Sequence, residues 1–401
     1  MRKRGEIARR MREQAWLVDR AIQLLGPDIC WPMSSIALGG IGPDVAGDIQ
    51  YIRANIKKYN DVSGEYAKFA VKREEMAKRA EDEGHLITAG EYYFAASFLY
   101  GCAMFPIHED DDKENIAYNA KKVECYNKFI KYSRRPVERV ELPFEGKSLP
   151  GLLHLPANRS GKVPCVLDMI GMDGFKEQSN SLHADKHLER GMAVFAIDIP
   201  GHGESLINKI RCNPETVVRA GKVAVDYLVK RPEIDADKIA VSGISFGSFW
   251  SILIAAHDSR MKAVAGRLFC HEPGFNTIFN CAQPPYKARF IWMAGYENED
   301  EFDKFAQTLT WKGLAAKIKC PFLMAGGEWD ELSPLEYTYD LYNEVKTPKK
   351  LVVFEGQTHS LHHAYVDAST IVADWLRDRL DGKPMKSEIV YVDMFGRQTK
   401  K

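Results

Sequence analysis

The sequence Gly243-Ile244-Ser245-Phe246-Gly247 lies between a short apolar run, residues 238–241, and an apolar segment that continues to His257. The run is typical of a buried strand and the segment of a helix. A G-x-S-x-G sequence in this context predicts a tight strand-to-helix turn, because side chains at the two glycine positions would collide with neighbouring backbone. Such a turn lifts the hydroxyl of Ser245 above the edge of a sheet. Ser245 is therefore the candidate nucleophile.

A serine nucleophile needs a base to take its proton and a third group to orient that base. Asp330 follows the predicted strand 321–326 in the sequence GGEWDELSP, and His359 follows the predicted strand 350–354 in EGQTHS. Both loops are expected at the carboxyl edge of the sheet, where open α/β sheets build their sites. The chain order serine, aspartate, histidine predicts a catalytic triad of Ser245, Asp330 and His359.

Other titratable side chains near these loops are weaker candidates. Two glutamates remain alternatives to the orienting aspartate: Glu328 and Glu331. Two histidines at the start of the last predicted helix are expected at the surface or the rim: His362 and His363. His202 lies in DIPGHGES, residues 198–205, and we expect it to be structural because the loop is shaped by its two glycines.

The oxyanion of a tetrahedral intermediate needs backbone N–H donors. One donor is expected from Phe246, the residue after the nucleophile. The other is expected from Gly171-Met172-Asp173-Gly174, the loop after the third predicted strand. Met172 is the first choice for this second donor, and Asp173 remains the alternative.

Strands and helices alternate along the catalytic half of the chain, residues 136–401. Strands are predicted at 137–143, 149–155, 164–170, 192–199, 238–241, 263–269, 321–326 and 350–354. Helices are predicted near 181–190, 214–230, 335–345 and 364–380, besides the one after Ser245. This alternation indicates parallel βαβ units, and hence a doubly wound α/β sheet. Residues 271–309 form an aromatic-rich insertion after the sixth strand. The last twenty residues are expected to be a tail, with a little strand character at 389–392.

Residues 1–135 are expected to form a helical domain that supplies one wall of the pocket and is not an independent module. Within it, 87–105 is apolar on nearly every side, which predicts a helix buried between neighbours. The acidic run 108–114 (HEDDDKE) is expected to be a solvated turn between helices.

The composition favours a small-molecule partner. The chain has 401 residues, with 55 basic and 55 acidic side chains, so no overall field recruits nucleic acid or an anionic membrane. No apolar stretch reaches the roughly 18 residues of a membrane span. The eight cysteines are scattered with no metal-ligand spacing, which indicates reduced thiols in a cytoplasmic protein. We expect neither a metal nor a cofactor.

Five motifs together resemble a subfamily of α/β-hydrolases that includes the FrsA-like esterases, a bacterial dihydroxypseudooxynicotine hydrolase of nicotine breakdown and a fungal polyketide-shortening hydrolase. The motifs are GMDGFKE (171–177), DIPGHGES (198–205), GISFG (243–247), GGEWD (326–330) and EGQTH (355–359). The resemblance covers about 137–380, and more loosely the helical half.

This resemblance implies an α/β-hydrolase fold, the triad given above, a helical cap over the active site and a homodimer. It also implies cleavage of a carbon–carbon bond beside a ketone in an aromatic or polyketide-like substrate. Glu272 and Asp173 are then the candidate pocket residues. Glu272 would hold or polarise the substrate, although a helix-capping or surface role is an equal alternative. The same triad also suits hydrolysis of an aromatic ester or lactone, and acyl transfer to an alcohol or amine is a third possibility.

Overall fold

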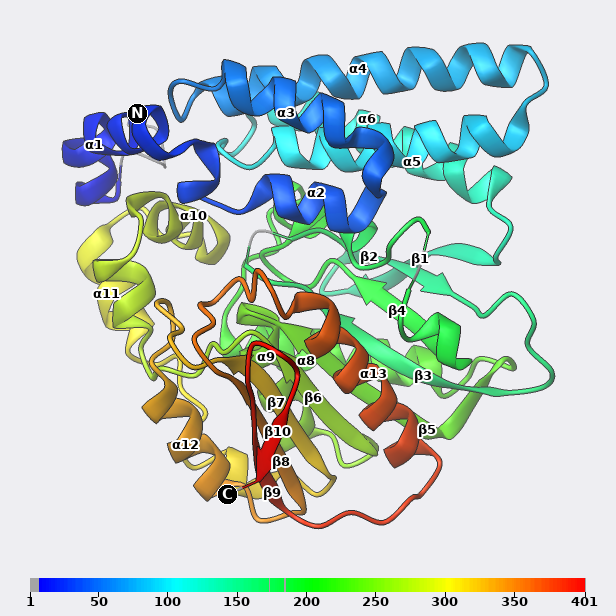
Figure 1. The fold of residues 1–401 in the computed structure, drawn as a ribbon, viewed down its shortest axis with the longest axis vertical. Helices are drawn as coiled ribbons and strands as arrows, with labels where there is room; N and C mark the ends of the chain where they lie inside the picture. Colours follow the sequence, from blue (N-terminus) through cyan, green and yellow to red (C-terminus); the bar gives the residue numbers. More distant parts are fainter. Residues whose placement is uncertain (1–6, 173, 184, 401) are drawn as a thin grey trace.

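The computed structural model, which describes residues 7–172, 174–183 and 185–400, has a helical layer above a ten-stranded sheet (Figure 1). The helices of the layer are α1 (Arg9–Leu25), α2 (Met33–Ile41), α3 (Ala46–Asn55), α4 (Asp61–Asp82), α5 (Leu86–Ala103) and α6 (Lys113–Tyr132). The first strand begins at Val137, so the change from helices to strands falls where the sequence pattern changes.

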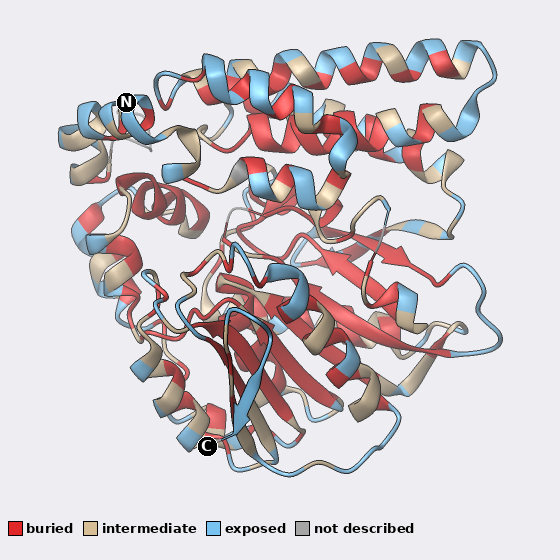
Figure 2. Cartoon of the chain, in the orientation of Figure 1, coloured by how far each residue is buried: buried red, intermediate tan, exposed pale blue. Residues whose placement is uncertain are grey.

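Helix α5 is the centre of the helical layer, as its apolar sequence predicts. It packs between α4 and α6, and its side chains from Tyr93 to Ala103 are all buried (Figure 2). The core of this layer also takes in Leu152 and Ala196 from the sheet. The helical layer therefore packs directly on the strands and shares a core with them.

The sheet is mostly parallel. Its strands are β1 (Val137–Phe144), β2 (Lys147–His154), β3 (Val163–Met169), β4 (Ala193–Ile197), β5 (Ile234–Ile244), β6 (Ala263–Arg267), β7 (Phe322–Gly327), β8 (Lys349–Phe354), β9 (Glu388–Val392) and β10 (Gln398–Lys400). Their spatial order is β1-β2-β4-β3-β5-β6-β7-β8-β9-β10. Pairing is parallel from β4 across to β9 and antiparallel at the two edges. The chain reverses its direction of progress at β3, which places a topological switch point between β3 and β5.

Helices cover both faces of the sheet. They are α7 (Gly203–Ile207), α8 (Pro214–Leu228), α9 (Phe246–His257), α12 (Leu335–Glu344) and α13 (Tyr365–Leu380). Side chains alternate between the faces: Leu167 and Val241 join the core under α8 and α9, while Val166 and Ala240 join the core under α13. Burial on both faces explains why β3 to β8 read as apolar runs in the sequence.

Two expectations for the catalytic half are wrong. Among the described residues of the helix predicted at 181–190, which exclude 184, only a 3₁₀ turn forms, Leu188–Arg190, because the carboxylate of Asp185 accepts the backbone N–H groups of His187 and Leu188. The strand character predicted at 389–392 is confirmed as β9, but the terminal segment is not a tail, since β9 pairs in parallel with β8 and buries Val390 and Val392.

The aromatic insertion folds into a π-helical turn (Thr277–Cys281) and the helices α10 (Pro284–Ala294) and α11 (Glu299–Ala306). Helix α10 lies beneath the helical layer and is largely buried (Figures 1 and 2). The acidic run is not simply solvated, because Asp110 accepts the indole N–H of Trp292 at 2.8 Å and pairs with Arg211. In the described parts of the chain, no helix has both the length and the apolar character needed to cross a membrane.

Candidate active site

The turn between β5 and α9 holds Ser245 in a strained conformation. Its φ of 52° and ψ of −125° lie in a region that L-residues rarely occupy. A Cβ added to Gly243 would lie 2.1 Å from the carbonyl oxygen of Gly247, and one added to Gly247 would lie 2.1 Å from that of Met169. The turn is also tied to β6, since the backbone N–H of Ser245 donates to the carbonyl of Arg267 at 2.8 Å. Both glycines are therefore required by close backbone packing.

Ser245, His359 and Asp330 come together at the carboxyl edge of the sheet. The hydroxyl oxygen of Ser245 lies 2.8 Å from Nε2 of His359. The other ring nitrogen, Nδ1, lies 3.0 and 2.9 Å from the two carboxylate oxygens of Asp330. The imidazole thus lies between hydroxyl and carboxylate, in the geometry in which a histidine can accept the serine proton while the carboxylate orients its ring.

The loop after β7 fixes the carboxylate of Asp330. Its Oδ1 accepts the backbone N–H groups of Leu332 and Ser333 at 3.0 and 2.9 Å. The two alternative glutamates bind backbone instead: Glu331 accepts the N–H of His359 at 2.8 Å, and Glu328 accepts that of Gly356 at 2.9 Å. Both therefore shape the loop that carries the histidine, and Asp330 alone of these three carboxylates bonds to its ring.

The surroundings of His359 stabilise the charged form of its imidazole more than water does. Burial by itself would lower the pKa of His359, but the Asp330 carboxylate, with help from Glu331, outweighs it and raises the pKa above the ordinary 6.5. Asp330 and His359 are only 5% and 7% exposed, so water screens their attraction weakly.

The loop after β3 reaches the nucleophile. A Cβ added to Gly171 would lie 3.4 Å from Cβ of Ser245, and Met172, the next residue, is buried. Phe246 is the first residue of α9, and the centre of its ring lies 4.5 Å from that of Phe275 and 4.7 Å from that of Phe290, with the ring planes tilted by 40° in both pairs. Asp173, the alternative oxyanion donor, lies outside the described residues.

The remaining predicted residues have bonds to backbone or lie at the surface. Glu272 accepts the backbone N–H of Thr277, the first residue of the π-helical turn, at 2.7 Å. His202 is fully buried with Nδ1 3.1 Å from the carbonyl of Pro200, and burial lowers its pKa to about 4. His362 and His363 are exposed in the turn before α13.

His271 is a further residue near the nucleophile that the sequence did not single out. Its Nδ1 lies 2.9 Å from the hydroxyl of Thr338 and its Nε2 3.4 Å from that of Ser248, whose hydroxyl donates to the carbonyl of Ser245 at 2.6 Å. Burial, with a smaller contribution from His359, lowers the pKa of His271 to about 3, so the ring is neutral. His271 lies in no sequence motif and has no fixed spacing from Ser245, so its position near the nucleophile could be seen only in the structure.

No grouping of three or more His, Cys, Asp or Glu side chains suited to a metal occurs among the described residues. All eight cysteines lie in the described part of the chain and are free thiols, and seven of them are buried.

A mostly parallel sheet with helices on both faces, and a strained serine at the turn after β5, define an enzyme of the α/β-hydrolase fold. The chain belongs to the FrsA-like esterase family, whose model matches residues 59–283, more than half of the sequence. A model of acetyl xylan esterases matches residues 217–378.

Individual relatives agree with this assignment. Hydrolase LUC6 of a Fusarium species is 30% identical over 60% of this chain and 65% of its own length. The 2,6-dihydropseudooxynicotine hydrolase of Paenarthrobacter nicotinovorans is 28% identical over 77% of this chain and 81% of its own. The solved structure of a 2,6-dihydroxy-pseudo-oxynicotine hydrolase superimposes with a TM-score of 0.76 at 26% identity, covering 88% of this chain and 98% of that one. The match thus spans just under two thirds of the first of these relatives.

Proposed function

We propose that the protein is a serine hydrolase in which Ser245 is the nucleophile, His359 the general base and Asp330 the group that orients it. The observation that carries this proposal is the 2.8 Å contact between the Ser245 hydroxyl and Nε2 of His359, made by a serine in a strained turn. A triad of this geometry is used for acyl transfer on unrelated folds, so its role follows from its arrangement.

The reaction proceeds through an acyl-enzyme. The hydroxyl of Ser245 adds to a substrate carbonyl while His359 accepts its proton, and the resulting oxyanion is met by the backbone N–H groups of Phe246 and Met172. His359 then returns the proton to the departing group, and the acyl chain stays on the serine. Water, deprotonated by His359, releases the carboxylic acid and restores the free hydroxyl.

The raised pKa of His359 predicts the pH dependence of this reaction. Only the neutral imidazole can accept the serine proton, so kcat/KM should rise with pH through an apparent pKa above 6.5 and then level off. Replacing Glu331 with glutamine removes one charge that raises this pKa, and the midpoint should move to lower pH. A pH–rate profile on a small ester measures both midpoints; a wild-type midpoint below 6.5 would contradict the assignment.

We propose that the bond cleaved is a carbon–carbon bond beside a ketone, in an aromatic or polyketide-like substrate. Two relatives are named as hydrolases of 2,6-dihydropseudooxynicotine and 20-hydroxy-prefusarin. The aromatic-rich insertion 271–309 also supports this choice, because pockets lined by aromatic side chains suit flat, ring-bearing substrates. The departing carbon must leave as a stabilised enolate or phenolate, to which His359 delivers the proton.

Hydrolysis of an aromatic ester or lactone is the second candidate. The name of the family, FrsA-like esterase, favours it directly. An alkoxide also leaves more readily than a carbanion, so ester hydrolysis requires less stabilisation of the leaving group by the active site. Acyl transfer to an alcohol or amine would use the same acyl-enzyme.

Matched substrates separate the two candidates. The protein would be incubated in ¹⁸O-labelled water with an acylphenol, a β-diketone and an ester of the same acyl group, and the products identified by mass. A carbon–carbon hydrolase should yield a labelled carboxylic acid together with a shortened ketone or phenol. If kcat/KM for the ester exceeds that for the acylphenol and the β-diketone by about 10³ or more, the protein is an esterase.

Assembly and location are also part of the proposal. The resemblance to this subfamily suggests a homodimer, and the scattered cysteines suggest a cytoplasmic protein. The balanced charge favours a small-molecule carbonyl compound as partner over nucleic acid or a membrane. The exposed apolar side chains of α1, which include Trp16, Leu24 and Leu25, provide a surface that pairing of two copies would bury.

A further inference from the structure

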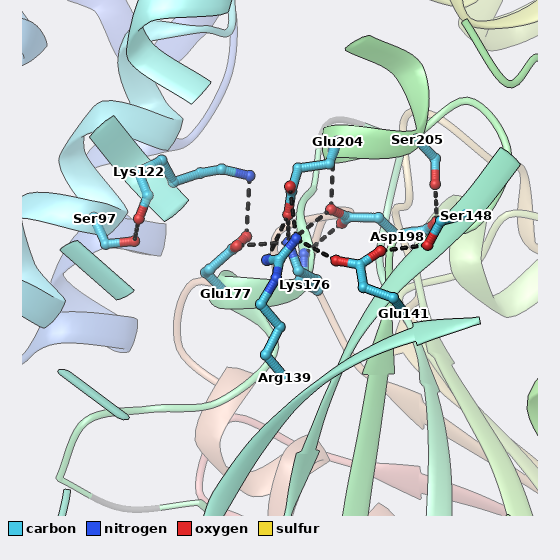
Figure 3. Close-up of polar contacts among 10 residues, drawn as sticks. All are labelled: Ser97, Lys122, Arg139, Glu141, Ser148, Lys176, Glu177, Asp198, Glu204 and Ser205. Atoms are coloured by element: carbon cyan, nitrogen blue, oxygen red, sulfur yellow. Dashed lines mark hydrogen bonds and ion pairs between the residues drawn. The ribbon is translucent and has the colours of Figure 1, made fainter. Parts of the chain in front are cut away.

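A group of buried charged side chains joins α6 of the helical layer to the loop after β3 (Figure 3). Nζ of Lys122 on α6 lies 3.0 Å from Oε2 of Glu177, and both side chains are almost wholly buried. Oε1 of Glu177 lies 2.6 Å from Nζ of Lys176. The same ammonium contacts Asp198 at 3.2 Å and also pairs with Glu204. The helical layer and the catalytic half are thus linked by ion pairs that water does not reach.

The buried charges in this group balance. The cations are Lys122, Arg139 and Lys176, and the buried carboxylates are Glu177, Asp198 and Glu204. Arg139 also pairs with Glu141, whose carboxylate is exposed to water. Burial opposes the charged form of Lys176, but the three carboxylates raise the pKa of its ammonium above the ordinary value. Removing a single member would leave an uncompensated buried charge, which is strongly unfavourable.

The helical layer and the catalytic half hold the loop from opposite sides. From the catalytic half, Asp198 accepts the backbone N–H of Lys176 at 2.7 Å. From the helical layer, the ammonium of Lys122 lies 5.0 Å from the centre of the Phe175 ring. That ring also packs on Gly101 of α5 so closely that a Cβ there would lie 2.1 Å from it. The backbone at Phe175 and Lys176 is therefore fixed by both parts of the molecule.

The other end of this loop meets the nucleophile. The backbone N–H of Gly174 donates to the carbonyl of Gly171 at 3.0 Å, which closes a tight turn around Met172. Gly171 in turn packs against Ser245, as described above. A shift of the loop at Phe175 would therefore move the N–H of Met172 relative to the serine.

We propose that Lys122 and Glu177 are positioning residues, whose ion pair fixes the loop after β3 so that the N–H of Met172 meets the oxyanion. This inference rests on the proposed serine-hydrolase function. It gives the helical layer a part in the chemical step. Even a substrate too small to touch the helices should then be turned over more slowly when the pair is broken.

The test is the full-length Lys122→Met variant with p-nitrophenyl acetate as substrate. We expect kcat to fall about 10–100-fold with little change in KM, because a displacement of about 1 Å in a catalytic group has effects of this size. The affinity for a trifluoromethyl ketone, which Ser245 converts to a bound oxyanion, should fall by the same factor. A second variant, Lys122→Met with Glu177→Gln, keeps the buried group neutral and should show the same losses if the single variant does not fold.

Two control variants separate positioning from stability. Lys121→Met removes the neighbouring lysine of α6, which pairs with Glu74 inside the helical layer. This variant should leave kcat and the affinity for the trifluoromethyl ketone unchanged. Asp110→Asn weakens a different contact between the two halves, with Arg211 and Trp292, and should lower Tm without lowering kcat.

The outcomes are distinct for the two proposals. If folded Lys122→Met, or the charge-balanced double variant, loses only Tm and keeps kcat and ketone affinity, the positioning role is wrong while the hydrolase proposal stands. If fluorophosphonate fails to label Ser245 in the unaltered protein, the hydrolase proposal itself fails.

Discussion

Replacing Ser245 with alanine should reduce kcat by about 10³–10⁶, the loss expected when one member of a cooperating triad is removed. Without the hydroxyl no acyl-enzyme forms, and His359 has no proton to accept. The residual rate would come from the oxyanion donors and from substrate binding. The fold should survive, since alanine is smaller than serine and the close contacts of the turn are made by its glycines.

Intact-protein mass spectrometry after fluorophosphonate treatment measures the same role directly. The unaltered protein should gain one adduct, and Ser245→Ala should gain none. Ser242, a buried serine in β5, provides a matched control, since Ser242→Ala should be labelled like the unaltered protein. An adduct on Ser245→Ala, or a tenth of the original activity, would show that another residue is the nucleophile.

The structural features that the sequence predicted correctly are determined by residues close together in the chain. The turn at Ser245 follows from two glycines at fixed offsets, and the β3 and β5 strands from apolar runs that both faces of the sheet bury. The approach of Asp330 and His359 could also be expected, because the carboxyl ends of neighbouring parallel strands meet at one edge. Each of these predictions needs only local sequence and the rule for parallel sheets.

The wrong secondary-structure predictions arise where a specific hydrogen bond or a distant strand pairing overrides the local sequence pattern. The segment 181–190 has helical composition, but the Asp185 carboxylate binds two backbone N–H groups and favours a turn. The strand β9 is short and flanked by polar residues, so only its pairing with β8 makes it part of the sheet. Pairing between strands that are distant in the chain cannot be recognised from the sequence of either strand alone.

Distant ion pairs are equally hidden from a single sequence. Lys122 lies on a helix with many lysines, and nothing local distinguishes the one that is buried against Glu177. In the same way, Asp110 belongs to a run that reads as solvated, yet its partners Arg211 and Trp292 lie far along the chain. These contacts join the helical layer to the catalytic half, so the sequence predicts the two parts better than their connection.

The orienting carboxylate gives the second large effect. Asp330→Asn should lower kcat by about 10⁴, because an amide in this place no longer holds the imidazole in the tautomer that accepts the serine proton. It also removes the charge that raises the pKa of His359, so the imidazolium formed during the reaction is stabilised less. The loop should keep its shape, since the amide oxygen can still accept the N–H groups of Leu332 and Ser333.

Steady-state kinetics on one ester would compare this variant with Glu331→Gln and Glu328→Gln. Each glutamine keeps an oxygen that can accept the same backbone N–H, from His359 and Gly356 respectively. Neither glutamate bonds to the imidazole ring, so these variants should lose less than about tenfold at pH values where His359 is neutral. A large loss in Glu331→Gln together with a small one in Asp330→Asn would transfer the orienting role to Glu331. The 2.9 and 3.0 Å contacts between Asp330 and Nδ1 of His359 predict the opposite order.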